Sequence, residues 1–206
     1  MPGMPTVTAI VFDLGNVLLP FNWDIAADRF CARARCSRRE LDDYLMTTPF
    51  VHQLETGQIT GAAFYRRVTG DFGCAMGYDE FAAIWSDIFT ADEQMLAMAA
   101  ALNGRWPRYI LSNTNAIHVE YVFRRFPSLR DFDGYVFSHE VGVLKPARAI
   151  YETLTRQFGL TPAATVFIDD ILANVEGARA AGWQAIHHQG AATTRAELTK
   201  LGVLPI

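Results

Sequence analysis

A short apolar run near the N-terminus, ending in an aspartate, constrains the rest of this chain. Ala9 to Phe12 are apolar, with the β-branched and aromatic side chains typical of a strand buried on both faces. Asp13 follows directly, and Gly15 and Asn16 are turn-forming residues. Open α/β sheets bind ligands at the carboxyl ends of their strands, so Asp13 is a candidate functional group. Taken alone, such an aspartate is more often a turn residue. Whether Asp13 is functional therefore depends on the residues that follow the other predicted strands.

From Arg108 onward, short apolar runs alternate with helical segments. The sequence predicts further strands over Tyr109–Leu111, Tyr135–Phe137, Thr165–Ile168 and Gln184–Ile186. Strands that alternate with helices form parallel sheets with right-handed crossovers. We therefore predict an α/β fold, a Rossmann-like doubly wound parallel sheet.

The stretch between the first and second strands is helical in character. From about Asp24 to Ala101, apolar residues recur at three- and four-residue spacings. Ser37 with Glu40 resembles a capping box, and Thr60 is a candidate cap for the helix that follows it. We expect residues 21–101 to form an inserted all-helical cap domain, and residues 1–20 and 102–206 to form the α/β core.

Composition argues against several other classes of protein. The 206 residues are 50% hydrophobic with a formal net charge of −4, which gives no electrostatic case for nucleic acid or an anionic membrane. No apolar run approaches the length of a membrane span, and the first residues lack the charged segment of a signal peptide. Three irregularly spaced cysteines argue against a disulfide framework. We expect a cytoplasmic protein with reduced thiols and no nucleic-acid or membrane partner; these features do not predict its oligomeric state.

Polar residues lie at the ends of predicted strands or begin the helix that follows. They are Asp13, Ser112, Asn113, Lys145, Asp169 and Asp170. The carboxyl ends of parallel strands share one edge of a sheet, so these side chains should converge. Carboxylates are ligands for Mg²⁺, lysine and hydroxyl groups neutralise phosphate oxygens, and an aspartate can act as a nucleophile. The set indicates phosphoryl transfer.

Four short motifs also follow one another in a familiar order. Asp13-Leu-Gly-Asn-Val, Ser112-Asn-Thr, Lys145-Pro and Phe167-Ile-Asp-Asp170 resemble the ordered motifs of the haloacid dehalogenase superfamily. The resemblance spans residue 7 to about residue 190, and the insertion after the first motif resembles that family's small helical cap. The run from Asp169 to Gly182 is similar to the subgroup of sugar-phosphate phosphatases that includes glucose-1-phosphatase-like proteins.

The resemblance implies how the phosphoryl group is handled. Asp13 would be the nucleophile that attacks phosphorus and forms an aspartyl-phosphate. Ser112 and Asn113 would bind the transferring phosphoryl group, and Lys145 would hold both the phosphate and the Asp13 carboxylate. The implied reaction is hydrolysis of a small phosphorylated metabolite, and a sugar phosphate is the expected substrate.

The resemblance also implies a Mg²⁺ site. Asp13 and the backbone carbonyl of Gly15 would bind the ion. Asp170 would be a direct ligand, and Asp169 would be either a ligand or a neighbour that supports the ligands. These residue types suit the ion, because Mg²⁺ prefers oxygen donors.

Gly15 departs from the pattern of the family's phosphatases, which usually have a second aspartate there as acid and base. Such help is typically worth ~10²–10⁴-fold in rate. Three explanations are open: a leaving group that needs little protonation, such as an anomeric sugar oxygen; a proton donor from the cap; or slow turnover. The candidate donors are His52, Glu55 and Asp24.

Other readings of the same residues are open at this stage. A 2-haloacid dehalogenase would use the same aspartate without a metal and would need an apolar pocket that binds a carboxylate, but it leaves Asp169 and Asp170 unexplained. A phosphate-binding module with little turnover, or a phosphotransferase such as a mutase, are further alternatives. Tyr44, Phe50 and Phe64 are cap aromatics that either face the substrate or pack between helices.

Overall fold

A single parallel sheet organises the core in a computed structural model that describes residues 6–205. Its strands are β1 (Ala9–Phe12), β2 (Arg108–Ser112), β3 (Gly134–Phe137), β4 (Thr165–Asp169) and β5 (Gln184–His187). The spatial order is β3-β2-β1-β4-β5, with every pair parallel. The chain therefore builds outward from β1 in both directions, which confirms the doubly wound fold. The reversal lies between β1 and β4, where sheets of this kind bind ligands.

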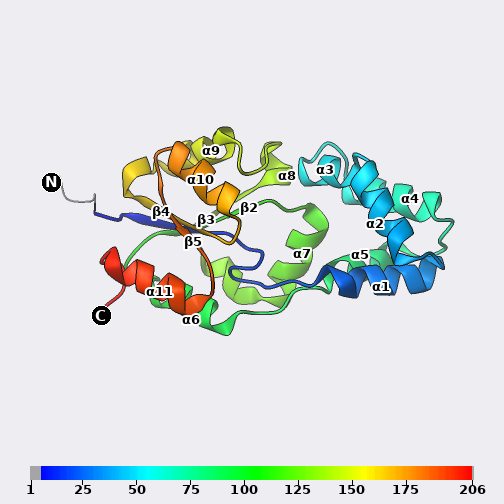
Figure 1. Ribbon diagram of the computed structural model, residues 1–206, viewed down its shortest axis with the longest axis horizontal. Helices are drawn as coiled ribbons and strands as arrows, with labels where there is room; N and C mark the ends of the chain where they lie inside the picture. The colour runs from blue at the N-terminus through cyan, green and yellow to red at the C-terminus, as the bar shows by residue number, and fades with distance from the viewer. Residues whose placement is uncertain (1–5, 206) are drawn as a thin grey trace.

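Helices cover both faces of the sheet (Figure 1). On one face lie α9 (Arg148–Phe158) and α10 (Leu172–Ala180). On the other lie α6 (Glu93–Ala101), α7 (Ala116–Arg125) and α11 (Ala191–Lys200). Alternation along each strand explains the two layers, since Val11 packs in one apolar cluster and Ile10 and Phe12 pack in the other.

The insertion after β1 forms a separate helical cap, on the right of Figure 1. Its helices are α1 (Trp23–Ala34), α2 (Arg38–Thr47), α3 (Phe50–Glu55), α4 (Gly61–Asp71) and α5 (Tyr78–Ser86). The cap has its own apolar cluster of aromatic residues, including Phe30, Phe64 and Phe81. The predicted capping box of Ser37 and Glu40 is confirmed, and Thr60 caps α4 as expected.

Two short linkers join the cap to the core, and they pair with each other. Phe21 and Phe89 form an antiparallel bridge, the Asn22 N–H donates to the Ile88 carbonyl, and the Thr90 N–H donates to the Pro20 carbonyl. Beyond this crossing, α6 packs in the core cluster rather than in the cap. The division of the chain into domains stays a proposal, but this packing favours a cap that ends near residue 90 rather than at residue 101.

Several short or weakly patterned elements were not expected from the sequence. These are α8 (Ser138–Val141), α11 and two 3₁₀ turns, Pro127–Asp131 and Pro162–Ala164. The three cysteines are free thiols. Within residues 6–205, none of the helices combines the length and apolar character needed to cross a bilayer. Residues 1–5, on which the expectation about a signal peptide rests, lie outside the described residues.

Gly57 is a sensitive point where the cap meets the core. It has a φ of +68°, and an added Cβ would overlap the carbonyl oxygen of His139 on α8. Gly73, with a φ of +58°, has open space around the same position. A side chain at either site incurs roughly 1–2 kcal/mol of left-handed strain. We predict that Gly57→Ala lowers the free energy of unfolding by about 1–3 kcal/mol more than Gly73→Ala, measured by urea denaturation. Equal losses would show that the cap does not press on α8.

Candidate active site

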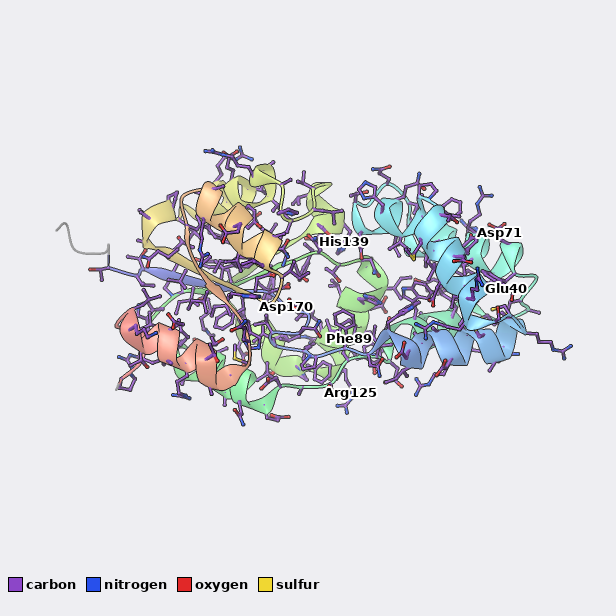
Figure 2. The ribbon with its side chains drawn as sticks, viewed as in Figure 1. Glu40, Asp71, Phe89, Arg125, His139 and Asp170 are labelled. Atoms are coloured by element: carbon purple, nitrogen blue, oxygen red, sulfur yellow. The ribbon has the colours of Figure 1, made fainter. Side chains whose placement is uncertain are left out.

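The predicted site residues come together at the carboxyl edge of the sheet, facing the cap. Asp13 follows β1, Ser112 ends β2 and Asp169 ends β4. In Figure 2, Asp170 lies at the edge of the core that faces the cap, and Phe89 lies in a linker between the cap and the core. Strand adjacency explains the convergence, because Phe12 is in register with both Ile110 and Ile168.

A buried lysine holds the centre of the site. Lys145 Nζ lies 2.8 Å from Asp13 Oδ1 and 2.6 Å from Asp169 Oδ2, and its side chain is only 1% exposed. Burial lowers the pKa of Lys145, but the two carboxylates outweigh it and the net shift is upward. Burial raises the pKa of Asp13 to about 6, although Lys145 opposes this rise. The Leu14 N–H also donates to Asp13 Oδ1 at 2.7 Å, so this oxygen of the carboxylate is held from two sides.

Asp169 is fully buried, and both of its carboxylate oxygens accept hydrogen bonds from neighbouring groups. Besides Lys145, it accepts from the Ile171 N–H at 2.8 Å and from Asn174 Nδ2 at 3.1 Å on each oxygen. Asn174 lies in the first turn of α10 and points back toward the end of β4. Asp169 therefore orients Lys145, and both of its oxygens are already engaged.

Asp170 is more accessible and completes a cluster suited to a cation. One oxygen from each of Asp13, Asp169 and Asp170 lies within 4.8 Å of the others. Asn16 Nδ2 donates to Asp170 Oδ2 at 3.3 Å, which joins the loop after β1 to the loop after β4. Three hard carboxylate donors around one point fit Mg²⁺. The Gly15 carbonyl lies in the same loop and accepts no hydrogen bond from the described backbone.

The loop after β2 presents Ser112 and the backbone of Asn113. The Ser112 hydroxyl makes only a long hydrogen bond of 3.4 Å, to the Asn113 carbonyl. The Asn113 side chain accepts from the Lys145 N–H at 2.7 Å and donates to the Lys145 carbonyl at 3.0 Å. This amide therefore holds the lysine-bearing loop in place, which leaves the backbone N–H as the group that Asn113 can offer a phosphoryl oxygen. Ser138 Oγ bridges the Thr114 N–H and carbonyl, at 2.9 and 3.0 Å, and fixes the far side of the loop.

A cavity of about 330 Å³ opens from this edge toward the cap. Most of its wall is apolar, contributed by Leu14, Phe21, Trp23, Leu45, Met46, Val51, Leu54, Trp85, Ile88 and Phe89. Its polar lining comprises Ser112, Asn113, Thr114, Asn115, His118 and Glu55, with Gly15 at the floor. Of the two readings left open for the cap aromatics Tyr44, Phe50 and Phe64, the structure favours packing within the cap. None of them lines the cavity, since Tyr44 bonds to Asp71, Phe50 packs beside Arg67 and Phe64 is buried in the cap.

His118 and Asn115 form a closed polar pair in the cavity wall. Asn115 Oδ1 caps α7 by accepting from the N–H groups of Ile117 and His118. Asn115 Nδ2 lies 3.2 Å from His118 Nδ1, and His118 Nε2 lies 3.2 Å from the Trp85 carbonyl. An amide N–H₂ is a donor and a carbonyl an acceptor, so the ring is neutral with its proton on Nε2. Burial lowers the pKa of His118 to about 4, in agreement with this assignment.

Of the three candidate proton donors of the cap, one lines the cavity and two do not. Glu55, at the end of α3, lines the cavity, and burial raises the pKa of its carboxyl. His52 is exposed and Asp24 pairs with Arg38, and neither belongs to the cavity wall. At Gly15, an added Cβ would lie 3.1 Å from the ring of Phe21. An aromatic ring therefore occupies the space next to the position at which the family's phosphatases usually place an acid.

Several residues that line the cavity or contact the carboxylate cluster were not singled out from the sequence. Asn174 carries a usable signal, because an amide five residues after Asp169 lies in the first helical turn and can point back at the strand end. Asn115 has the position of an N-cap before an apolar helix, which is also readable in principle. The sequence has no comparable signal for Phe21, Phe89 and His118, because their position in the cavity wall depends on how the linkers and α7 meet the cap.

A family model described as haloacid dehalogenase-like hydrolase matches residues 7–182. The chain is 27% identical over 198 residues to a D-ribitol-5-phosphate phosphatase of Bacteroides thetaiotaomicron, covering 92% of this chain and 96% of the relative. It is also 27% identical over 200 residues to a sesquiterpene phosphatase of Aspergillus oryzae, covering 95% and 97%. The structure resembles a HAD-family enzyme of Bacteroides thetaiotaomicron solved in complex with magnesium and inorganic phosphate, with a TM-score of 0.81, 25% identity and coverage of 87% and 93%.

The buried ion pairs of Lys145 predict how its substitution changes the free energy of unfolding. Lys145→Met leaves two buried carboxylates without their cation, so we expect the free energy of unfolding at pH 8 without metal to fall by roughly 3–5 kcal/mol. Asp13 has a raised pKa of about 6 in the folded wild type, and loss of the cation raises it further. A folded acid with a raised pKa binds more protons than the unfolded chain, so stability falls as pH rises through that window. The loss should therefore be smaller at pH 5 than at pH 8.

Lys200 supplies the matched control, because it is an exposed lysine paired with Glu197. Lys200→Met should change stability little at either pH, since exposed ion pairs contribute little. Urea unfolding in EDTA at pH 5 and pH 8 measures both variants. An equal loss for Lys145→Met at the two pH values would contradict the assignment of charge to this cluster.

Proposed function

Because the chain belongs to the haloacid dehalogenase-like hydrolases, we propose that it is a Mg²⁺-dependent phosphomonoesterase that works through an aspartyl-phosphate on Asp13. The observation that carries the proposal is the carboxylate cluster held in place by buried Lys145, in which Asp13 directly precedes the cavity-lining residues Leu14 and Gly15. The phosphatase names of the two relatives and the magnesium and phosphate in the structural neighbour support it.

The residues around Asp13 suit an attack on phosphorus. Lys145 and the Leu14 N–H hold Asp13 Oδ1 and so orient the carboxylate toward the cavity edge of the sheet. An oxygen of Asp13 forms the new bond to phosphorus, the ester oxygen departs with the electron pair and takes a proton, and water later cleaves the acyl phosphate. Lys145, the Ser112 hydroxyl and the Asn113 N–H are placed to stabilise the phosphoryl oxygens during both steps.

Asp13, the Gly15 carbonyl and Asp170 would hold Mg²⁺. The ion, when bound, would neutralise charge on the phosphoryl oxygens and align them with the nucleophile. Asp169 is the weaker ligand candidate because its oxygens already accept hydrogen bonds from Lys145, Ile171 and Asn174. Its proposed role is to position Lys145.

Glu55 is the proposed source of the proton that Gly15 cannot supply. It is the charged side chain among the residues that line the cavity, and its raised pKa favours the protonated form that a general acid needs. No hydrogen bond within residues 6–205 competes for the carboxyl group. The cap would therefore bring the acid to the leaving group when it covers the core.

The substrate is a small phosphorylated metabolite. The names of the two relatives point to different alcohols, one a polyol and the other a terpenoid. The sugar phosphate expected from sequence stays a prediction, as does a cytoplasmic location.

The alternatives are less well supported by the cavity. A 2-haloacid dehalogenase needs no metal and leaves the Asp169 and Asp170 carboxylates beside Asp13 unexplained, and Glu55 in the cavity wall would repel the carboxylate of its substrate. No specific observation on the described residues favours a mutase or a phosphate-binding module without turnover.

The proposed activity is tested by phosphate release from p-nitrophenyl phosphate. We expect release to require Mg²⁺, to stop in EDTA and to fall at least about 10³-fold in Asp13→Asn, which removes the nucleophile. Asp170→Asn should raise the Mg²⁺ concentration for half-maximal rate by about 10-fold or more. Asp79→Asn makes the same chemical change at an exposed position of α5 and should leave both quantities unchanged. Metal-independent release, or full activity in Asp13→Asn, would refute the proposal.

The role of Glu55 is tested by comparing leaving groups. Glu55→Gln should lower kcat by ~10²–10⁴-fold for an alkyl phosphate, whose departing alkoxide needs a proton. It should change kcat little for p-nitrophenyl phosphate, whose phenolate leaves unprotonated. Glu93→Gln, the same chemical change at an exposed position of α6 outside the cavity wall, is the control and should behave as wild type. An equal loss on both substrates would assign Glu55 a structural role instead.

A further inference from the structure

We propose that the ester hydrolysed at this site carries an apolar alcohol, alkyl or isoprenoid in character, rather than a polyol or sugar. The inference rests on the proposed function, since it concerns the leaving group that would lie in the cavity above Asp13. It is carried by the composition of the cavity wall, by the hydrogen bonds of its polar members and by the exposure of apolar side chains at its rim.

The wall of the cavity is apolar on both the cap side and the core side. Trp23 and Trp85 pack edge to face with their ring centroids 4.7 Å apart, and both line the space. Phe89 lies 5.8 Å from Phe21 and 5.2 Å from His118 between ring centroids, which continues the aromatic surface across the linkers. Binding pockets place their few polar groups where the ligand needs them, so a wall of this kind selects an apolar ligand surface.

The polar side chains in the wall have little capacity left for hydroxyl groups. Asn115 uses its oxygen on two backbone N–H groups and its nitrogen on His118, and His118 uses its remaining N–H on the Trp85 carbonyl. Ser112 and Asn113 are the residues proposed to bind the phosphoryl group. Glu55 and the Thr114 hydroxyl are then the remaining polar side-chain groups for an alcohol, and these two cannot satisfy the several hydroxyls of a polyol. Hydroxyls buried without partners weaken binding.

Exposed apolar residues continue the wall out to the rim. Met46 is 84% exposed and Phe21 is 44% exposed, although both are large apolar side chains that line the cavity. Exposed apolar residues that adjoin a groove are typical of a site for an apolar ligand. At ~30 Å³ for each water-sized group, the cavity volume of about 330 Å³ accommodates roughly ten non-hydrogen atoms. A longer chain would extend past Met46.

The chain-length dependence of hydrolysis tests this inference. Ethyl, butyl, hexyl and octyl phosphate are compared with ribitol 5-phosphate, each with Mg²⁺. We expect kcat/KM to rise by up to about fourfold for each added methylene (about 0.8 kcal/mol). Octyl phosphate should be preferred to ribitol 5-phosphate by at least tenfold. A flat series, or preference for ribitol 5-phosphate, would overturn the inference and leave the phosphatase proposal intact.

Binding of alkylphosphonates separates the two proposals. Their carbon–phosphorus bond resists hydrolysis, so calorimetry with wild-type protein and Mg²⁺ reports on the cavity alone. Octylphosphonate should bind at least tenfold more tightly than butylphosphonate. This preference without turnover of any ester would refute the phosphatase proposal while the apolar phosphate-binding site stands. Equal binding of the two phosphonates would overturn the further inference.

A pair of matched variants connects the preference with this cavity. Leu45 and Ile59 are both half-buried and pack on the apolar cluster of the cap, but only Leu45 belongs to the cavity wall. Leu45→Gln should lower kcat/KM for octyl phosphate about tenfold while that for ethyl phosphate changes less than twofold. Ile59→Gln should preserve the ratio between these substrates. An unchanged ratio in Leu45→Gln, or the same change in both variants, would contradict the assignment.

Discussion

The arrangement of the site depends on one buried ammonium group. Lys145 lies between Asp13 and Asp169, which belong to the two strands on either side of the point where the sheet reverses. A buried cation without partners is costly, so each carboxylate stabilises the lysine and the lysine holds the two strand ends together. With Asp170, three carboxylates face one ammonium, which leaves two negative charges. One divalent cation would neutralise them, so the electrostatics of the core and the proposed Mg²⁺ site share one origin.

Hydrogen bonds between polar groups connect the loops at the sheet edge to one another. Asn113 pairs with both backbone groups of Lys145, and Ser138 pairs with both backbone groups of Thr114. Asn16 reaches from the loop after β1 to Asp170. Each bond connects the loops that follow different strands. The backbone of Lys145 is therefore held by the side chain of Asn113. This explains how a segment outside the sheet can position the lysine between the two strand ends.

The core could be predicted well from the sequence because short stretches of neighbouring residues determine its strands. An apolar run marks each buried strand, a polar residue marks its end, and parallel pairing brings the ends to one edge, so Asp13, Ser112 and Asp169 could be placed together. α11 was missed because Ala191–Lys200 lacks a clear apolar stripe and is anchored mainly by Leu198. The cavity wall was missed for another reason. Helical periodicity shows that cap aromatics are buried, but it does not distinguish those confined to the cap interior, such as Phe64, from those that also line the cavity, such as Trp85.

Gly15 links the chemistry of the site to its specificity. The glycine removes an acid from the floor of the cavity, and the ring of Phe21 fills the adjacent space. The cavity surface next to Gly15 is therefore apolar, which favours an apolar leaving group. The same surroundings raise the pKa of Glu55, since a carboxylate is poorly solvated among apolar side chains. A protonated Glu55 is the form that can donate to a poor leaving group such as an alkoxide. The glycine at position 15, the apolar cavity and the proposed acid on the cap are therefore consistent parts of one arrangement.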